Sequence, residues 1–586
     1  MAIRGRRRAA LAIVTMLAAL TSACATIPEQ STPKIESTGG VQADGALAAP
    51  DPKADPLTLV RDFVGAAGNP EAAKGYLTEN ARKAWPGDGP PTIIAETFGT
   101  LPQPQRERNT LGDAPENVAV VVLTVTKVGK LAPDRSYSPA FGSDEFQVVL
   151  LRDNESAPWR IDSPPDEIMI TLPNFDQSYR KVNVYFFDPE LRVLVPDLRY
   201  VPAQPVSGLP DRVVRLLVAG PSDTVANAVR TYFGPEAEIR TNAVTDPDDG
   251  ALVVNLTKIG DRTPDDRRLI AAQIVWTLKE ITQSRIRLMV DGQVLVPGHV
   301  DWRQGDVPFY DTTTKPGANL PGLFLNPGTG RVYSLDNGNP IPGPAGSGAI
   351  RVSSAAQSSD GKALAVVEEV STGSLLRIGE FGRELPEVGL QASTLTRPTW
   401  LLSMPNAPSN EVWTVQNGVE VVRLLRTSAN SWAVDRVNAS ALRTFGTITD
   451  LRLSRDGTRI AAVISGQVVV ASVARDKDSV TIQAPRALAS TEVRNVVGVD
   501  WVSQETVVAA TAQSTQPVVN VSVDGFKLDR YNSANLGAGV SAVTAAPDRD
   551  VVVTDGSGMW TAAETLQVWR LLPHHQVPGA RPFYPG

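Results

Sequence analysis

The fold of the second half of this chain is decided by the stretch Leu453-Ser454-Arg455-Asp456-Gly457-Thr458-Arg459, which leads into the apolar run Ile460-Ala461-Ala462-Val463-Ile464. Gly after Asp allows the positive φ of a tight turn, and the short apolar run that follows is typical of a buried strand. Such runs recur in steps of 48, 48, 47 and 45 residues, through Leu364, Val412, Ile460, Val507 and Val552. A period in the forties with short strands predicts a β-propeller, with one four-stranded blade in each repeat.

The repeats make five blades visible, and the sequence leaves room for a sixth within residues 318–586. Residues 322–325 and 331–333 could supply two strands of that sixth blade, or could complete the ring by pairing with strands near residues 566–572. We therefore expect five or six blades, with Trp400 and Trp501, which hold equivalent positions before two turns, packed between blades. A β-sandwich with coincidental spacing is the alternative.

The other end of the chain is organised around Cys24, the single cysteine of the 586 residues. A basic segment and an apolar run over residues 9–20 precede it. The run is about as long as a signal-peptide core and shorter than the roughly 20 residues that cross a bilayer. Ser22 and Ala23 are small, as at a cleavage site, while Thr21 stands where Leu is commonest.

This pattern resembles the lipobox of bacterial lipoproteins. The resemblance implies that residues 1–23 are a lipoprotein signal peptide and that Cys24 carries an S-linked diacylglycerol and an N-linked palmitoyl chain. An ordinary signal peptide with a coincidental cysteine, or a short uncleaved anchor, are the alternatives. Residues 24–55 are rich in Pro, Ser, Thr, Gly and Ala and predict a disordered tether.

Composition excludes several classes of function. The formal net charge of −7 gives no electrostatic footprint for nucleic acid. With Cys24 committed to lipid, no thiol remains for a disulfide or a metal site, and only three histidines are present: His299, His574 and His575. We expect neither a cofactor nor a metal, and no nucleic-acid partner.

Residues 56–175 predict a small α+β domain. Apolar residues recur at helical spacing after Pro56, a second helix is expected over 71–85, and strands are expected over 118–128, 146–152 and 159–161. Two helices followed by a curved antiparallel sheet resemble the domains similar to nuclear transport factor 2 (NTF2-like). No paired acids with a histidine occur here, so a packing or binding role is favoured over catalysis.

Residues 180–300 predict an α/β domain. We expect a strand over 182–187 with a hairpin partner over 194–202, a helix capped by Asp211, a strand over 251–256, a helix over 267–281 and a strand over 286–290. The order of these pieces resembles the GerMN domain of spore-germination proteins, which implies a non-catalytic module of the cell envelope. The motifs that carry it are the 182–188 strand, Leu216-Leu217-Val218-Ala219-Gly220-Pro221, Val275-Trp276-Thr277-Leu278 and Val290-Asp291-Gly292.

Several motifs suggest chemistry at first sight and have simpler interpretations. A calcium loop beginning at Asp246 would need Gly and Glu where Ala251 and Thr257 stand, so a solvated turn is expected. Residues 343–348 lack the Lys-Ser/Thr of a phosphate loop and predict a linker or blade turn. His574 and His575 lie in a Pro-rich tail, which disfavours a metal pair. Three arginines near 262–268 alternate with aspartates and indicate a solvated helix start or a docking face: Arg262, Arg267 and Arg268.

Taken together, the lipobox, the tether, the small α+β domain, the GerMN-like domain and the propeller resemble the LpqB family of actinobacterial lipoproteins. The GerMN-like motifs and the turn at 453–459 carry this resemblance best. It implies a non-catalytic protein, anchored by lipid on the extracytoplasmic face of the cell membrane. It also implies binding to the sensor histidine kinase MtrB and modulation of MtrA–MtrB signalling, with effects on cell-envelope homeostasis and division. An envelope receptor or enzyme for glycan or lipid, and a structural scaffold, remain the alternatives.

Overall fold

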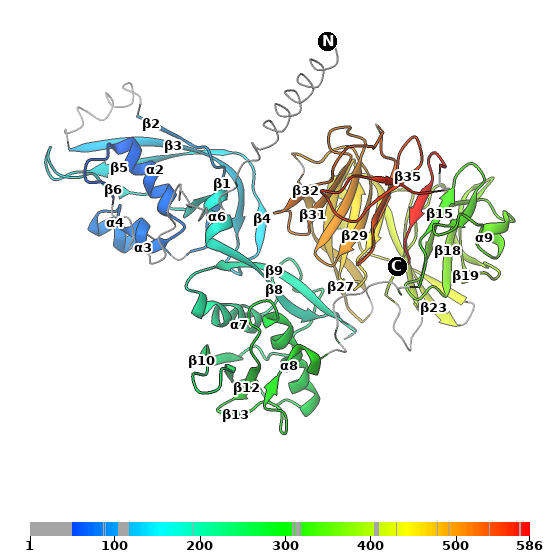
Figure 1. Ribbon diagram of the computed structural model, residues 1–586, viewed down its shortest axis with the longest axis horizontal. Coiled ribbons are helices and arrows are strands. Elements are labelled where there is room, and N and C mark those ends of the chain that lie inside the picture. Colours follow the sequence, from blue (N-terminus) through cyan, green and yellow to red (C-terminus); the bar gives the residue numbers. More distant parts are fainter. Residues whose placement is uncertain are drawn as a thin grey trace, which may run out of the picture. The chain divides into compact units, whose positions relative to one another are not determined.

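The computed structural model describes residues 50–586, except 86, 88, 104–116, 191–192, 308–309, 311–316, 318, 403–408, 429–430, 478, 490, 538 and 574–575. The predictions for the signal peptide, Cys24, most of the tether and the His574-His575 pair lie outside the described residues. Contacts join residues 49–586 into one unit. Along it follow a small α+β domain, a second domain with two longer helices, and a series of β-sheets (Figure 1).

The first domain begins with α2 (Pro56–Ala66), because Asp55 accepts hydrogen bonds from the first amides of the helix and its apolar side faces the core. The prediction of a single helix over 71–85 is wrong: the structure has two helices there, α3 (Pro70–Lys74) and α4 (Glu79–Ala84). The break has a cause in the tertiary structure. Leu77 bridges to Ile161 in the sheet, and the Thr78 side chain then caps α4.

Those helices pack against a seven-stranded sheet in the order β6-β5-β3-β1-β7, with β2 and β4 also paired to β3. The pairs are antiparallel except β1–β7, so the expected antiparallel sheet carries one parallel strand. A short helix, α6 (Leu172–Ser178), ends the domain. The strands are β1 (Thr92–Ile94), β2 (Gly99–Pro102), β3 (Val118–Leu131), β4 (Tyr137–Pro139), β5 (Ser143–Leu151), β6 (Arg160–Ser163) and β7 (Met169–Thr171).

The second domain opens with the predicted hairpin, β8 (Tyr179–Phe187) and β9 (Leu194–Pro202). Helix α7 (Leu209–Ala219) starts after Gly208, so Asp211 is not its cap; its carboxylate instead accepts from the Ala243 amide at 3.0 Å. Helix α8 (Pro264–Leu278) begins three residues earlier than expected, because Thr263 and Asp266 form a capping box. A sheet follows the order β10 (Glu238–Thr245), β11 (Leu252–Thr257), β12 (Ile286–Val290) and β13 (Gln293–Val294), with β14 (Asp301–Trp302) paired to β12.

The remaining strands form the predicted propeller. The described residues give five four-stranded sheets and a three-stranded closing sheet, hence six blades. Both expectations for residues 322–333 are partly right: β15 and β16 build the sixth blade, and a C-terminal strand completes it. That strand is β37 (Arg581–Phe583), whereas β36, near residues 566–572, belongs to the fifth blade.

We number the blades by their strands. The first holds β17 (Val352–Gln357), β18 (Ala363–Val370), β19 (Gly373–Glu380) and β20 (Glu387–Ala392); the second β21 (Thr399–Trp400), β22 (Glu411–Gln416), β23 (Glu420–Ser428) and β24 (Ser431–Arg436). The third holds β25 (Ile448–Leu453), β26 (Arg459–Ile464), β27 (Gln467–Arg475) and β28 (Val480–Leu488); the fourth β29 (Val496–Ser503), β30 (Thr506–Thr511), β31 (Val518–Ser522) and β32 (Leu528–Arg530). The fifth holds β33 (Ala542–Thr544), β34 (Val551–Thr554), β35 (Met559–Ala562) and β36 (Arg570–Leu571), and the closing blade β15 (Leu323–Asn326), β16 (Arg331–Ser334) and β37.

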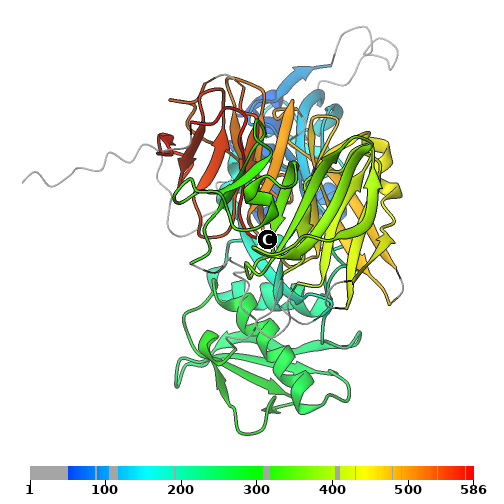
Figure 2. The ribbon, with the colours of Figure 1, turned by 90° about the vertical axis from the view of Figure 1, so that its right-hand side faces the viewer.

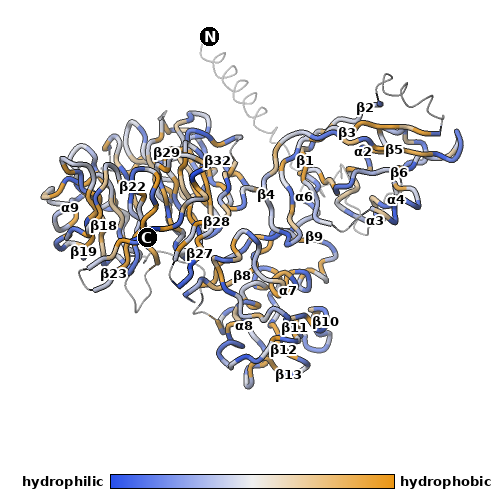
Figure 3. Tube along the Cα trace, turned by 180° about the vertical axis from the view of Figure 1, so that it is seen from behind, coloured by the Kyte–Doolittle hydropathy of each residue, from blue (hydrophilic) through white to orange (hydrophobic). Residues whose placement is uncertain are grey.

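Buried side chains hold neighbouring blades together, as hydrophobic strands inside the propeller suggest (Figure 3). The Trp400 indole donates to the carbonyl of Ala356 in the preceding blade at 2.9 Å, and Trp501 donates to that of Arg452 at 3.1 Å. The prediction that both tryptophans pack between blades is confirmed.

The remaining short helices are α9 (Pro344–Ser347), η1 (Val206–Gly208), η2 (Gln304–Asp306) and η4 (Ser440–Phe445).

Candidate functional site

The hairpin β8–β9 lies against turns of the third and fourth blades. Glu505, in the turn after β29, accepts from Lys181 Nζ at 2.7 Å and from Asn183 Nδ2 at 2.6 Å. Arg459, beside the Asp456-Gly457 turn, donates to the carbonyl of Pro196 at 2.7 Å. The sequence predicted these residues only as turns before strands, so their contact with another domain was missed.

A cluster of four aromatic rings joins all three domains. Phe526, in the turn between β31 and β32, lies 5.0 Å from the ring centroid of Tyr137, 5.4 Å from that of Phe175 and 5.2 Å from that of Tyr200. The Tyr200 hydroxyl donates to the carboxylate of Asp524 at 2.8 Å. Burial and the Asp524 charge both raise the pKa of Tyr200, so the phenol stays a hydrogen-bond donor.

A buried ion pair fixes the hairpin to its own domain. Arg199 Nη2 lies 2.6 Å from Asp197 Oδ2, and the two side chains are 1% and 4% exposed. The Arg199 guanidinium also donates to the carbonyls of Asp134 and Gly220, while Asp197 accepts from the amide and hydroxyl of Ser222. Because Arg199 contacts Asp134 of the first domain and Gly220 of the second, this pair helps to specify how the hairpin sits between the two domains.

A second group of buried charges lies along the propeller axis, around Asp500. Its carboxylate accepts from Thr544 Oγ1 at 2.8 Å and lies 3.4 Å from Arg397 Nη2 and 3.6 Å from Arg452 Nε. Burial alone would raise the pKa of Asp500, but the charges of Arg452 and Arg397 outweigh it and hold the pKa below its usual value. Burial lowers the pKa of Arg452 to about 10, which still leaves that group charged at neutral pH.

At one end of the propeller axis, Pro585 and Gly586 form a floor. Arg455 donates to the Pro585 carbonyl at 2.6 Å, and the Gly586 amide donates to the carbonyl of Gln357 at 2.8 Å. Gln357 belongs to the first blade, and Arg455 follows the first strand of the third blade. Because Gly586 and Pro585 contact these two residues, the segment 585–586 crosses the propeller axis. Figure 2 shows the C-terminus lying among the blades.

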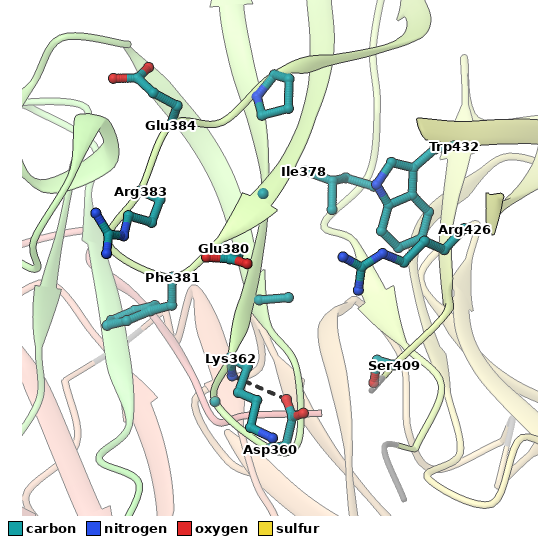
Figure 4. Close-up of a pocket in the computed structure, with 14 residues that line it drawn as sticks. Asp360, Lys362, Ile378, Glu380, Phe381, Arg383, Glu384, Ser409, Arg426 and Trp432 are labelled. Atoms are coloured by element: carbon teal, nitrogen blue, oxygen red, sulfur yellow. Dashed lines mark hydrogen bonds between the residues drawn. The ribbon is translucent and has the colours of Figure 1, made fainter. Parts of the chain in front are cut away.

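On the same end of the propeller as the hairpin contacts, a groove of about 1080 Å³ lies between the first two blades. We call it the turn groove. Figure 4 shows Asp360 and Lys362 at one end of it, Arg383 and Glu384 toward the other, and Trp432 with Arg426 on the side of the second blade. Its other lining residues are Gly361, Ala363, Ile378, Gly379, Glu380, Phe381, Pro386 and Ser409. The groove thus combines both signs of charge with two large aromatic rings.

Other motifs singled out in the sequence take structural roles. Asp249 lies 2.6 Å from Arg287 and 2.7 Å from Arg285, and the Arg287 side chain in particular holds the pKa of Asp249 well below its usual range. The turn at residues 246–250 is therefore part of an ion-pair network. Residues 344–347 form the helical turn α9, as a blade turn predicts.

Arg267, Arg268 and His299 also contact other residues of the chain. Arg268 pairs with Asp265 at the surface, as a solvated helix start predicts, whereas Arg267 donates to the Leu295 carbonyl. His299 packs on Trp302, with ring centroids 4.0 Å apart.

Within the described residues, no group of three or more His, Cys, Asp or Glu side chains is placed to hold a metal ion. None of the helices in that part of the chain combines the length and hydropathy needed to span a bilayer.

Family models match three parts of the chain. Residues 49–176 match the model described as "Lipoprotein LpqB, N-terminal domain", residues 183–296 match "Sporulation and spore germination", and residues 330–585 match "Lipoprotein LpqB beta-propeller domain". These matches follow the chain in the order of its three structural domains.

Full-length relatives are similar as well. Lipoprotein LpqB of Mycolicibacterium smegmatis is 30% identical over 99% of this chain and 100% of its own length. Lipoprotein LpqB of Rhodococcus jostii is 31% identical over 94% of this chain and 93% of its own. Among solved structures, the Cps50 (Swd1) β-propeller domain of Myceliophteria thermophila is 10% identical, covers 41% of this chain and 93% of that one, and has a TM-score of 0.27.

Proposed function

Because the chain belongs to the LpqB family of lipoproteins, as the order of its segments predicted, we propose that it is a membrane-anchored accessory protein that binds the sensor histidine kinase MtrB. In this proposal Cys24 carries the lipid on the extracytoplasmic side and residues 24–55 are the tether. Binding to the kinase then modulates MtrA–MtrB signalling, and through it cell-envelope homeostasis and division. The protein acts by binding and not by catalysis, in keeping with relatives that are named as lipoproteins.

Membrane anchoring makes such a partnership physically reasonable. Two proteins held at one membrane have a high effective concentration for each other, so a weak interface is sufficient. A partner changes the activity of a kinase only if it binds one conformational state of the kinase more tightly than another. The accessory protein must therefore present a surface of fixed shape, and the shared aromatic cluster and the buried Asp197–Arg199 pair favour such rigidity.

The observation that carries the proposal is the turn groove. Interface centres are enriched in Trp, Arg and other aromatic residues, and the groove holds Trp432, Arg426 and Phe381. Its rim carries the exposed charges of Arg383 and Glu384, each of which can pair with an opposite charge on a partner and so fix its orientation. The hairpin contacts lie on the third and fourth blades of the same end of the propeller, away from the groove.

The test is co-purification of MtrB from membranes with the full-length protein. We expect the double charge reversal Arg383→Glu with Glu384→Arg to reduce the recovered kinase at least about fivefold, because the reversal replaces complementary contacts with repulsive ones. The matched control is Arg436→Glu on β24, an arginine whose side chain is 80% exposed and which does not line the groove. No association in the natural chain, together with unchanged MtrA phosphorylation after gene deletion, would rule the proposal out.

A second function is favoured by the same groove: binding of an envelope glycan or lipid without a kinase partner. Acidic residues and aromatic rings side by side, such as Glu380, Glu384, Phe381 and Trp432, are suited to sugar hydroxyls and sugar faces. Binding of purified cell-wall fragments or lipid vesicles by the natural chain, lost in Trp432→Ala while kinase recovery is unchanged, would select this alternative. A scaffold role would instead tolerate both sets of substitutions.

A further inference from the structure

On the propeller axis, at the end opposite the Pro585–Gly586 floor, lies a cavity of about 310 Å³. The cavity is lined by residues at the beginnings of the innermost strands, among them Ser353, Arg397, Thr449 and Arg581, whereas the floor lies at the far ends of those strands. Its volume is at the lower end of the roughly 300–1,000 Å³ typical of small-molecule sites. It is separate from the turn groove and shares no lining residue with it. We call it the channel mouth.

Two of the residues that line this cavity, Ser354 and Arg397, carry buried polar atoms without a hydrogen-bond partner. Ser354 Oγ is buried without a hydrogen-bond partner, its residue being 9% exposed, and Arg397 Nε is likewise buried without one. Arg581, at the exposed rim, donates from Nη1 to the Ser353 carbonyl at 2.8 Å. A buried polar atom without a partner costs free energy, so such groups in a cavity suggest a bound polar molecule.

The cavity also carries a ring of acceptors. Ser353, Thr449 and Ser541 occupy corresponding positions in the first, third and fifth blades, and each hydroxyl donates to a main-chain carbonyl of the second strand of its own blade. The donor of each hydroxyl is thus used, while its oxygen can still accept. Asp450 adds a carboxyl group, of which one oxygen accepts from the Val499 amide at 3.3 Å.

The charge balance selects the ligand further. The charged side chains that line the mouth are Arg397, Arg581 and Asp450, two cations and one carboxyl group. Asp500 beneath them lies 3.4 Å from Arg397, but its single negative charge is shared with Arg452, so it does not neutralise Arg397 by itself. Burial raises the pKa of Asp450, which further favours a net positive site.

We propose that the channel mouth binds a sugar acid, that is, a small polyhydroxylated molecule with one carboxylate. The carboxylate contacts Arg397, Arg581 and Ser354, because guanidinium groups match carboxylate geometry. The ligand hydroxyls donate to the acceptor ring of Ser353, Thr449 and Ser541, and one contacts Asp450. Leu395 and Val497, which also line the cavity, face the carbon skeleton. This site is independent of the kinase proposal.

The experiment is isothermal titration calorimetry of the full-length protein with D-glucuronate as the probe. We expect saturable binding of glucuronate, and binding at least about tenfold weaker for D-glucose, which lacks the carboxylate, and for acetate, which lacks the hydroxyls. Phosphate is the third comparison. Preference for phosphate over glucuronate would overturn the assignment to a carboxylate.

Two substitutions leave the Asp500 network intact and test the site directly. Arg581→Gln and Ser354→Ala are each expected to weaken glucuronate binding, Arg581→Gln by at least about tenfold because a charge-assisted hydrogen bond is lost. The matched control, Arg436→Gln on the outer strand β24, is expected to bind as the natural chain does. Absence of glucuronate binding, or binding unchanged in both variants, would overturn the proposal; circular dichroism of each variant confirms that it is folded.

Discussion

Replacing Phe526 by Ala is expected to loosen the attachment of the propeller to the first two domains without unfolding the propeller. Phe526 belongs to the turn between β31 and β32, and its ring contacts Tyr137, Phe175 and Tyr200 outside the propeller. The strands of the fourth blade do not depend on these contacts. Truncation therefore removes an interface contact and leaves the strand pairing of the blade in place.

The size of the effect follows from the geometry. Truncating a fully buried Phe to Ala costs about 3–5 kcal/mol, and each aromatic pair adds about 0.5–1.5 kcal/mol beyond its buried area. Because Phe526 makes three such pairs but is only partly buried, we expect the free energy of domain association to fall by roughly 2–4 kcal/mol. This corresponds to a roughly thirtyfold to thousandfold larger population of separated domains.

Hydrogen–deuterium exchange measured by mass spectrometry reports that population directly. Peptides that contain Phe175 and Tyr200 should exchange faster in Phe526→Ala, while the buried strand β26 should keep its protection. The matched control is Phe381→Ala, which truncates a phenylalanine in the corresponding turn of the first blade, where its partly buried ring packs within the propeller. Unchanged exchange around Tyr200, or faster exchange throughout the propeller, would refute the reasoning.

Three further outcomes are expected. Asp500→Asn removes the carboxylate shared by Arg452 and Arg397 and should lower the free energy of unfolding of the propeller by about 3–5 kcal/mol in urea titrations; a loss under about 1 kcal/mol would contradict this. Because the folded-state pKa of Asp500 is lowered, its contribution is full above about pH 4 and disappears as the pH falls through that pKa, so the natural chain and Asp500→Asn should converge in stability in acid. Cys24→Ala should move the protein from the membrane fraction to the soluble fraction, and mass spectrometry of the natural N-terminus should find acyl chains on Cys24.

The propeller was predictable because its signals are local. A turn of polar residues, with Asp-Gly in the first and third repeats, and the apolar run after it specify each second strand without reference to the rest of the chain. The steps of 45 to 48 residues then place the blades. Helix bounds were less accurate, because capping by Thr263 and the Leu77 bridge to Ile161 involve side chains and tertiary contacts that periodicity does not report.

The contacts between domains were not predictable from such patterns. Glu505, Asp524 and Phe526 all lie in turns, where polar residues are ordinarily solvated. The partner of Glu505, Asn183, and the partner of Asp524, Tyr200, are each more than 300 residues away along the chain. Gln504-Glu505 stands where the first and third repeats have Asp-Gly, but the second and fifth repeats also lack Asp-Gly, so this departure does not identify the turn that meets the hairpin.

The turn at 453–459 connects the residues on the propeller axis with the hairpin β8–β9 of the second domain. Arg455 contacts the floor by donating to the Pro585 carbonyl. The next residue, Asp456, accepts from Gln504 at 2.9 Å, and Gln504 also lies within hydrogen-bond distance of the Leu194 carbonyl in the hairpin. Arg459, the last residue of the turn, donates a hydrogen bond to the Pro196 carbonyl in the hairpin. Arg397 lines the channel mouth and shares Asp500 with Arg452, which precedes this turn. Because packed and hydrogen-bonded groups move together, we expect a ligand that shifts Arg397 to act on the turn. Occupancy of the mouth should therefore change hydrogen exchange at residues 194–200, and a channel ligand that leaves that segment unaltered would show that the two regions are uncoupled.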